Sequence, residues 1–188
     1  MKWFAGISMV ALLLATQIVR ADEIKSGPQP GDKIGAFDVV KCAGAADDGV
    51  DVGNKLCYRC RYGSKPMVMV FARKSDESLA SLIKQLDSVV AQNSDKQLKA
   101  FVNLVGESRD AAETAAKTFG AKNSFANVPI VVPEESENGP DNYGINPKAE
   151  VTVIVASGGK VTASHAYAGT PDSAQVQEIL SDVTKALQ

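Results

Sequence analysis

Between residues 66 and 187, short apolar runs of strand length alternate with longer stretches of helical periodicity, and this alternation restricts the fold more than any other feature. Residues 66–72 (PMVMVFA) and 98–105 are continuous apolar runs, as expected for strands buried on both faces of a sheet. Between them, residues 79–90 carry apolar side chains at i, i+3, i+4 and i+7 spacing, which predicts an amphipathic helix. Strands that alternate with helices favour an α/β fold with a parallel pair.

Further strands are expected on both sides of this unit. Residues 36–40 are a short candidate. Residues 128–132 are apolar but bracketed by Pro129 and Pro133, and because proline cannot donate to a neighbouring strand, they are predicted to form at most an edge strand. Residues 151–156 and 160–167, joined by the turn Ser157-Gly158-Gly159, are predicted to form a hairpin. With no internal repeat, residues 36–188 are expected to form one domain after an extended lead-in of residues 22–35.

Polar and conformationally special residues mark the expected helix ends. Ser75 is predicted to cap the helix that follows the first buried strand. Ser108 is predicted to cap a second helix that runs through Phe119 and stops at Gly120, the usual position of a C-terminal glycine. Thr170 and Pro171 are expected to start the final helix, because proline is favoured at the first helical position.

The first 21 residues have the layout of a secretory signal peptide. A single Lys2 precedes an apolar run, and Val19-Arg20-Ala21 provides small or β-branched residues at a cleavage site. The apolar run of about 16 residues is short for an uncleaved membrane anchor, which needs roughly 20. Cleavage after Ala21 removes two basic residues and no acidic one, so the exported chain is more acidic than the formal net charge of −2. We therefore expect a periplasmic or extracellular protein without a membrane segment and without the basic excess of a nucleic-acid-binding protein.

The order of elements from residue 66 onward, β-α-β-α-β-β-β-α, resembles the thioredoxin fold. The strand-turn-strand segment VTVIVASGGKV (residues 151–161) is similar to the hairpin of that family. The lead-in GPQPGDKIGAFDVV (residues 27–40) resembles the N-terminal strand of the peroxiredoxin-like and periplasmic thioredoxin-like branches. The resemblance implies a three-layer α/β sandwich, a central mixed β-sheet flanked by helices, with an N-terminal extension and a cysteine-containing loop.

The resemblance also implies a redox site where the strand of residues 67–72 meets the next helix. Relatives place two cysteines there, but this chain has Ser75-Asp76-Glu77-Ser78. A serine hydroxyl cannot exchange with a disulfide, so thioredoxin-type and peroxidase chemistry are not expected at this position. The family's cis-proline is also absent, because Glu150 or Val151 occupies its place before the hairpin.

The three cysteines of the chain lie instead in a loop region of residues 42–64, where Cys57-Tyr58-Arg59-Cys60 forms a C-x-x-C motif. Basic residues flank this motif, and positive charge stabilises a thiolate. One hypothesis is therefore a displaced redox pair, in which Cys57 attacks and Cys60 resolves. The alternative is a structural disulfide, either Cys57–Cys60 or Cys42–Cys57, in an oxidising compartment. The odd count leaves one cysteine free, paired between molecules or in a metal site, and Cys42 is the alternative partner or the free thiol.

Other candidate residues have ordinary structural explanations. His165, the single histidine, is expected to be hydrogen-bonded on its strand. Glu134, Glu135, Glu137 and Asp141 are expected to form a solvated acidic loop rather than a cation site. No cofactor is expected. Two functions remain: thiol–disulfide exchange with an unknown protein partner, or a non-catalytic binding or assembly module in which Cys57–Cys60 is a structural disulfide.

Overall fold

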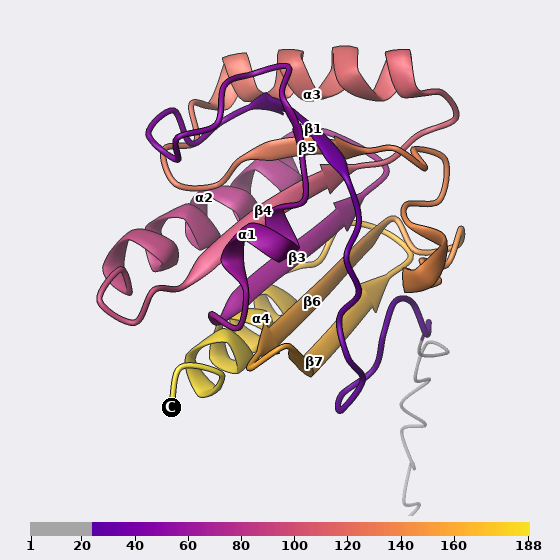
Figure 1. Ribbon diagram of the computed structural model, residues 1–188. Coiled ribbons are helices and arrows are strands. Elements are labelled where there is room, and N and C mark those ends of the chain that lie inside the picture. Colours follow the sequence, from indigo (N-terminus) through magenta and orange to yellow (C-terminus); the bar gives the residue numbers. More distant parts are fainter. Residues whose placement is uncertain (1–23) are drawn as a thin grey trace, which may run out of the picture.

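The computed structural model describes residues 24–188, so the predicted signal peptide lies outside the described residues. A seven-stranded sheet forms the centre of the molecule (Figure 1). The strands are β1 (Val39–Ala43), β2 (Lys55–Leu56), β3 (Met67–Ala72), β4 (Lys99–Leu104), β5 (Ile130–Pro133), β6 (Val151–Ser157) and β7 (Lys160–Tyr167). The helices are α1 (Tyr58–Tyr62), α2 (Glu77–Gln92), α3 (Arg109–Asn123), the 3₁₀ turn η1 (Asp141–Tyr143) and α4 (Ser173–Lys185). None of the helices within residues 24–188 has the length and apolar character needed to span a bilayer.

The sheet is mixed, with strand order β2-β1-β5-β4-β3-β6-β7. β3, β4 and β5 are mutually parallel, whereas β6 and β7 form the predicted antiparallel hairpin at one side. On the other side, β1 is antiparallel to both β5 and β2. The short strand β2 therefore points in the same direction as β3, β4 and β5, and the carboxyl ends of all four lie at one edge of the sheet.

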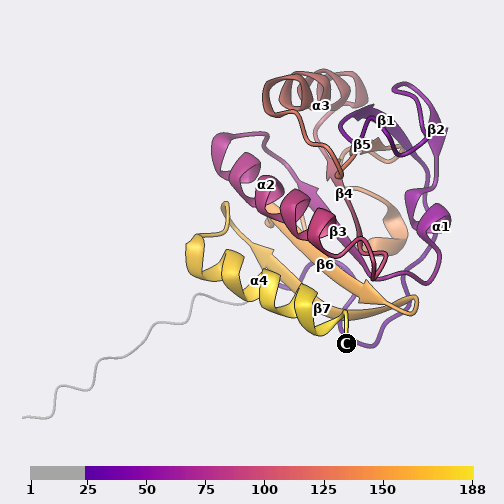
Figure 2. The ribbon, with the colours of Figure 1, turned by 90° about the vertical axis from the view of Figure 1, so that its left-hand side faces the viewer.

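The two faces of the sheet are covered differently, as Figure 2 shows. Alternate side chains of β3, such as Val68 and Val70, pack under α2, α3 and α4, which all contribute to one apolar cluster. The intervening side chains, such as Met67 and Met69, face a second cluster that includes residues of α1, η1 and the lead-in. Because both faces are covered, β3 is buried along its whole length, as its continuous apolar sequence predicts.

The structure corrects the prediction for residues 128–132, which form an interior strand and not an edge strand. β5 pairs with β4 on one side and with β1 on the other. The two flanking prolines do not prevent this, because Pro129 precedes the strand and Pro133 is its last residue. All four residues of β5 are buried. Proline at the ends of a strand leaves its central amides free to donate on both sides.

Two helix ends also differ from the sequence-based expectation. Asp76, and not Ser75, caps α2, with its carboxylate accepting a 2.8 Å hydrogen bond from the amide of Leu79. Ser108 caps α3 as expected, but that helix continues through Gly120 to Asn123. Gly120 is required by packing and not by helix termination, because a Cβ at this position would overlap the Cβ of Ala43.

The last helix begins two residues later than expected, at Ser173 and not at Pro171. Asp172 caps α4 and forms a reciprocal capping box with Gln175, in which each side chain accepts from the other residue's amide at 2.9 Å. Pro171 therefore precedes the cap and does not occupy the first helical position. The boundary shifts by two residues, and the helix itself is present as predicted.

Candidate functional site

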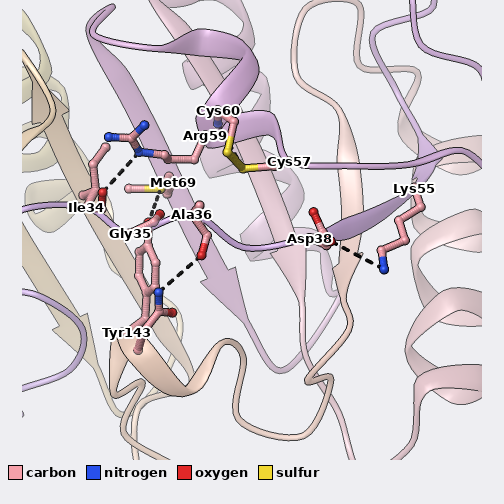
Figure 3. Close-up of a disulfide and its surroundings, with 11 residues drawn as sticks. Ile34, Gly35, Ala36, Asp38, Lys55, Cys57, Arg59, Cys60, Met69 and Tyr143 are labelled. Carbon is pink, nitrogen blue, oxygen red and sulfur yellow. Dashed lines mark hydrogen bonds and ion pairs between the residues drawn. A yellow bond between two sulfur atoms is a disulfide. The ribbon is translucent and has the colours of Figure 1, made fainter.

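The C-x-x-C motif lies at the junction between β2 and α1, where it forms a disulfide (Figure 3). Cys57 is the N-cap of α1, and its Sγ accepts a 3.1 Å hydrogen bond from the amide of Cys60. The Cα atoms of the two cysteines are 5.2 Å apart. Gly63 ends the helix with φ of 63°, a conformation that favours glycine. The two sulfur atoms are thus held on the first turn of a helix at the end of a strand.

Aromatic packing fixes α1 against the sheet. Tyr58 and Tyr62 are buried, and both rings lie within 6.0 Å of the ring of Phe101 on β4, measured between ring centroids. The hydroxyl of Tyr58 donates a 2.5 Å hydrogen bond to Asp48. Burial, followed by the hydrogen bond to Asp48, raises the pKa of Tyr58 far above its ordinary value, so the phenol stays protonated and remains a donor.

A buried lysine continues this anchor into the neighbouring loop. Lys41 on β1 is 1% exposed, and its ammonium group donates to Asp48 at 2.7 Å. The same group donates to the carbonyls of Ala45 and Val50 at 2.9 and 2.7 Å. All three protons of the ammonium have acceptors, which compensates for the burial of its charge. The position of α1 therefore depends on contacts that do not involve the cysteines.

The disulfide opens into a groove of about 430 Å³. Cys60 is exposed and Cys57 is half-buried. The lead-in segment around Phe37 forms one side of the groove, and the loop between β5 and β6 forms the other. Four carboxylates line the groove, and its lining contains no Lys or Arg; the acidic residues are Asp38, Glu134, Glu135 and Asp141.

The register of the sheet explains why these distant residues meet. Leu56 and Pro133 both pair with Val39, from opposite sides of β1. Cys57 and Glu134 are the next residues of their parallel chains, so both emerge at the same edge. Contacts from η1 complete the groove: the side-chain amide of Asn142 donates to the carbonyl of Ala36 at 3.3 Å.

The structure reverses the expectation that the cysteines have cationic surroundings. Lys55 pairs with Glu134 at 2.7 Å and with Asp38 at 3.5 Å, and these contacts raise the pKa of Lys55 and lower that of Glu134. Arg59 donates to the carbonyl of Ile34 at 3.1 Å and points away from the sulfur atoms (Figure 3). Arg61 donates to the carbonyl of Asp48 at 2.7 Å. The groove next to the disulfide is therefore acidic, although the surrounding sequence is basic.

The junction between β3 and α2 contains a network of ion pairs and hydrogen bonds. The resemblance to the thioredoxin fold implies a cysteine pair at this junction, which this chain lacks. Ser75 and Ser78 are both exposed there. The guanidinium of Arg73 donates to the carbonyls of Ala149 and Glu137 at 3.1 and 3.0 Å. Burial lowers the pKa of Arg73, which nevertheless remains a cation.

The residues around Arg73 complete this closure. Lys74 pairs with Glu150 at 2.5 Å. Glu150 immediately precedes β6, at the position where the thioredoxin family has its cis-proline. Thr170 donates to the same carboxylate at 3.3 Å. The junction is filled by ion pairs and hydrogen bonds and offers no thiol.

Cys42 takes no part in the disulfide site. It is a free thiol on β1, 3% exposed, and its Sγ donates to the carbonyl of Val40 at 3.6 Å. Burial, followed by the nearby charge of Glu113, raises the pKa of Cys42 to about 11. The structure thus selects the Cys57–Cys60 pairing over Cys42–Cys57, and no cluster of metal-ligating side chains is found within residues 24–188.

The single histidine is hydrogen-bonded, in line with its predicted structural role. The Nε2 atom of His165 lies 3.0 Å from a carboxylate oxygen of Asp182 on α4. Its ring stacks on Tyr167, with centroids 6.4 Å apart. The hydrogen bond to Asp182 joins β7 to α4, whereas the stacking contact lies within β7.

Comparisons with known proteins identify the fold. No protein-family profile matches the sequence, and no curated protein sequence matches it. Among solved structures, a protein assigned as the thiol:disulfide interchange protein DsbE of Chlorobium tepidum superposes with a TM-score of 0.62 at 14% identity, covering 86% of this chain and 99% of the other. The chain has a thioredoxin-like fold. Mycobacterium tuberculosis AhpC superposes with the same TM-score and identity, covering 85% of this chain and 98% of its own.

A third structure, the thiol peroxidase from Chromobacterium violaceum, has a TM-score of 0.54 at 17% identity and covers 88% of this chain and 92% of its own. This thioredoxin-like domain carries its disulfide directly after β2, which is four strands from β3 in the sheet order, and not at the β3–α2 junction. Sequence reasoning found both cysteines but missed the acidic groove. Its residues come from three separate segments, and only the strand register brings them together.

Proposed function

We propose that this protein is an exported thiol–disulfide exchange protein that acts through Cys57 and Cys60. The observation that carries the proposal is the position of the pair. A disulfide with one exposed cysteine lies at the N-terminus of a helix, directly after a strand, at the sheet edge where the parallel strands end. Ligand and catalytic sites of open α/β sheets form at this edge.

The exposure of the two cysteines favours Cys60 as the sulfur that exchanges with a partner. An incoming thiolate attacks the Sγ of Cys60, a new disulfide forms between partner and Cys60, and the Cys57–Cys60 bond breaks. The electron pair leaves on Cys57, where the amide of Cys60 already donates a hydrogen bond to the sulfur. Such a donor stabilises the departing thiolate, which then takes a proton from water.

A second partner thiolate completes the cycle. It attacks the partner's sulfur in the mixed disulfide, releasing an oxidised partner and the thiolate of Cys60. Two electrons have then passed to the Cys57/Cys60 pair, and the reverse sequence reduces a partner disulfide. This assignment exchanges the roles that sequence order suggests for the two cysteines, because Cys57 is the less accessible one.

The acidic groove favours the reducing direction. The negative charge of four carboxylates disfavours the thiolate form of the reduced cysteines. Because the reduced form is then less stable, the disulfide is harder to reduce and its reduction potential is lower. We therefore expect a reduction potential near that of thioredoxin, about −270 mV, and far from the value of about −120 mV of a strong oxidant.

Two further observations support the proposal. One structural neighbour is assigned as a thiol:disulfide interchange protein, and it covers 86% of this chain. The first 21 residues predict export, and disulfides persist in the oxidising compartments that export reaches. The partner is then a protein that exchanges thiols with Cys60, and the chemistry requires no cofactor.

A non-catalytic binding module is the second candidate, and the closed junction at Arg73 favours it, because the position used by relatives carries no thiol. The disulfide would then only stabilise α1. A ring of four residues gains roughly 2 kcal/mol from loop entropy, and this disulfide joins residues three apart within one element. It does not connect distant segments, which is the usual role of a structural disulfide.

Redox titration of the purified exported chain distinguishes the two candidates. The protein is equilibrated in glutathione buffers, and free thiols are alkylated and located by mass spectrometry. A reduction potential of the Cys57–Cys60 pair above about −300 mV supports exchange, whereas a potential below about −300 mV overturns it. The Cys57→Ser/Cys60→Ser variant must lose all exchange activity, and Cys42→Ser must retain it.

A further inference from the structure

The groove beside the disulfide has a strong imbalance of charge. Its lining contains four carboxylates and no basic side chain. Lys55 pairs with two of them, Asp38 and Glu134, and Arg109 acts on Glu134 from beyond salt-bridge distance. Within residues 24–188, neither Glu135 nor Asp141 has a basic group within salt-bridge distance, and both are exposed. The groove therefore presents an uncompensated negative charge to anything that approaches the sulfur atoms.

The groove also has an apolar part that suits a polypeptide. Phe37 and Pro140 line it, and both are buried. The ring of Phe37 packs edge-on against Tyr143, with centroids 4.9 Å apart, so this surface is fixed. An extended chain whose cysteine reaches Cys60 would place neighbouring residues over these side chains and between the carboxylates.

We propose that the partners of Cys60 are polypeptide segments in which lysine or arginine residues flank the reacting cysteine. This inference rests on the proposed exchange function and adds its substrate class. Opposite charge in a groove raises association rates, and like charge lowers them. Glutathione carries a net negative charge, so the same groove disfavours it as a direct partner. The carboxylates select the partner, and the disulfide carries out the chemistry.

Charge-matched peptides test the inference. The reduced full chain is mixed with homodimeric disulfides of three peptides of equal length, in which two lysines, two serines or two glutamates flank the single cysteine. The second-order rate of each is divided by its rate with dithiothreitol, which removes differences in intrinsic reactivity. We expect the lysine peptide to react at least tenfold faster than the glutamate peptide at low salt, with the serine peptide between them. At high salt the difference should shrink, because screening weakens exposed charges.

Variants assign the effect to the groove. Glu135→Gln/Asp141→Asn should reduce the ratio of the lysine-peptide rate to the serine-peptide rate severalfold. The ratio within one variant is compared, because removing carboxylates also changes how readily the reduced cysteines form thiolates. Asp95→Asn/Glu178→Gln is the matched control, since it also removes two negative charges from exposed acids, and neither residue lines the groove. This control should retain the full preference.

The outcomes separate the two proposals. Exchange with all three peptides at equal normalised rates, or fastest exchange with the glutamate peptide, overturns the substrate class and leaves the exchange function standing. A preference that survives in Glu135→Gln/Asp141→Asn also overturns it, because the groove would not be its cause. No exchange with any peptide, in protein whose folding is verified by circular dichroism, overturns the exchange function itself.

Discussion

Leu56 and Pro133 occupy equivalent positions on the two sides of β1, each paired with Val39. Because β2 and β5 run in the same direction, the next residues, Cys57 and Glu134, leave the sheet at the same level. This relationship places the disulfide beside the acidic loop, although 77 positions separate the two residues in the sequence. It also places the disulfide on the same edge as Arg73, which follows the end of β3.

The two cysteines should differ in their ability to trap a partner. In Cys57→Ser, the exposed Cys60 should form a stable mixed disulfide with the lysine-flanked peptide, because no second thiol resolves it. In Cys60→Ser, the half-buried Cys57 should form this adduct at least tenfold more slowly. Both variants are made with Cys42→Ser, and adducts are followed by intact mass spectrometry. Equal rates, or faster trapping by Cys57, would contradict the assignment of Cys60 as the exchanging sulfur.

Tyr58→Phe should destabilise the protein by about 1–2 kcal/mol in urea unfolding. The variant loses the 2.5 Å hydrogen bond to Asp48, a bond to a charged acceptor, while the ring can still pack on Phe101. Tyr62→Phe is the matched control, because no hydrogen bond of the Tyr62 hydroxyl is found among the described residues. The control should change stability by less than about 0.5 kcal/mol. A similar loss in both variants would show that the bond to Asp48 is unimportant.

Cys42 should make the stability of the protein fall at alkaline pH. The pKa of this thiol rises from 9.0 to about 11 on folding, so the unfolded chain loses the proton first as pH increases. The contribution is fully present below pH 9 and is lost as pH rises towards 11. Buried tyrosines titrate in the same direction, so the measurement is the difference between wild type and Cys42→Ala. Between pH 8.5 and 11, the free energy of unfolding of wild type should fall relative to that of Cys42→Ala by up to about 2 kcal/mol. A difference that stays constant over this range would refute the prediction.

Gly120→Ala should destabilise α3 against the sheet, although alanine is the better helix former by up to about 1 kcal/mol. The new methyl group would overlap the side chain of Ala43, and overpacking of this kind costs about 1–3 kcal/mol. The double variant Ala43→Gly/Gly120→Ala should recover most of the loss, because the overlapping atom is then removed. Urea unfolding of the wild type and the two variants measures both effects, and a double variant no more stable than Gly120→Ala would exclude this explanation.

The sequence predicts those parts of the fold that depend on local pattern. The period and apolarity of residues 66–72 and 151–167 identify β3 and the hairpin, because burial on both faces of a strand, or a turn of two glycines, leaves a local trace. The resemblance to the thioredoxin fold was also correct. The sequence-based prediction of an edge strand is wrong for β5, because whether a strand has one neighbour or two depends on segments far away in the chain.

The candidate site shows the same limit more sharply. The C-x-x-C spacing identifies Cys57 and Cys60, but their electrostatic surroundings cannot be obtained by counting nearby basic residues. Lys55 forms an ion pair with Glu134, and Arg59 donates a hydrogen bond to the carbonyl of Ile34. The acidic residues come from the loop after β5, which only tertiary structure brings to the disulfide. Charge around a site is a property of the folded surface, and sequence neighbours are a poor guide to it.

The anchoring of α1 through Tyr58, Asp48 and Lys41 has a consequence for how a partner recognises the oxidation state. These contacts do not involve the sulfur atoms, so we expect them to remain when the disulfide opens and the dithiol and disulfide forms to have the same backbone. A partner then cannot distinguish them by shape. Both forms should occupy the same partner surface with comparable affinity, and the ratio of oxidised to reduced protein, rather than a conformational signal, would set the direction in which electrons flow.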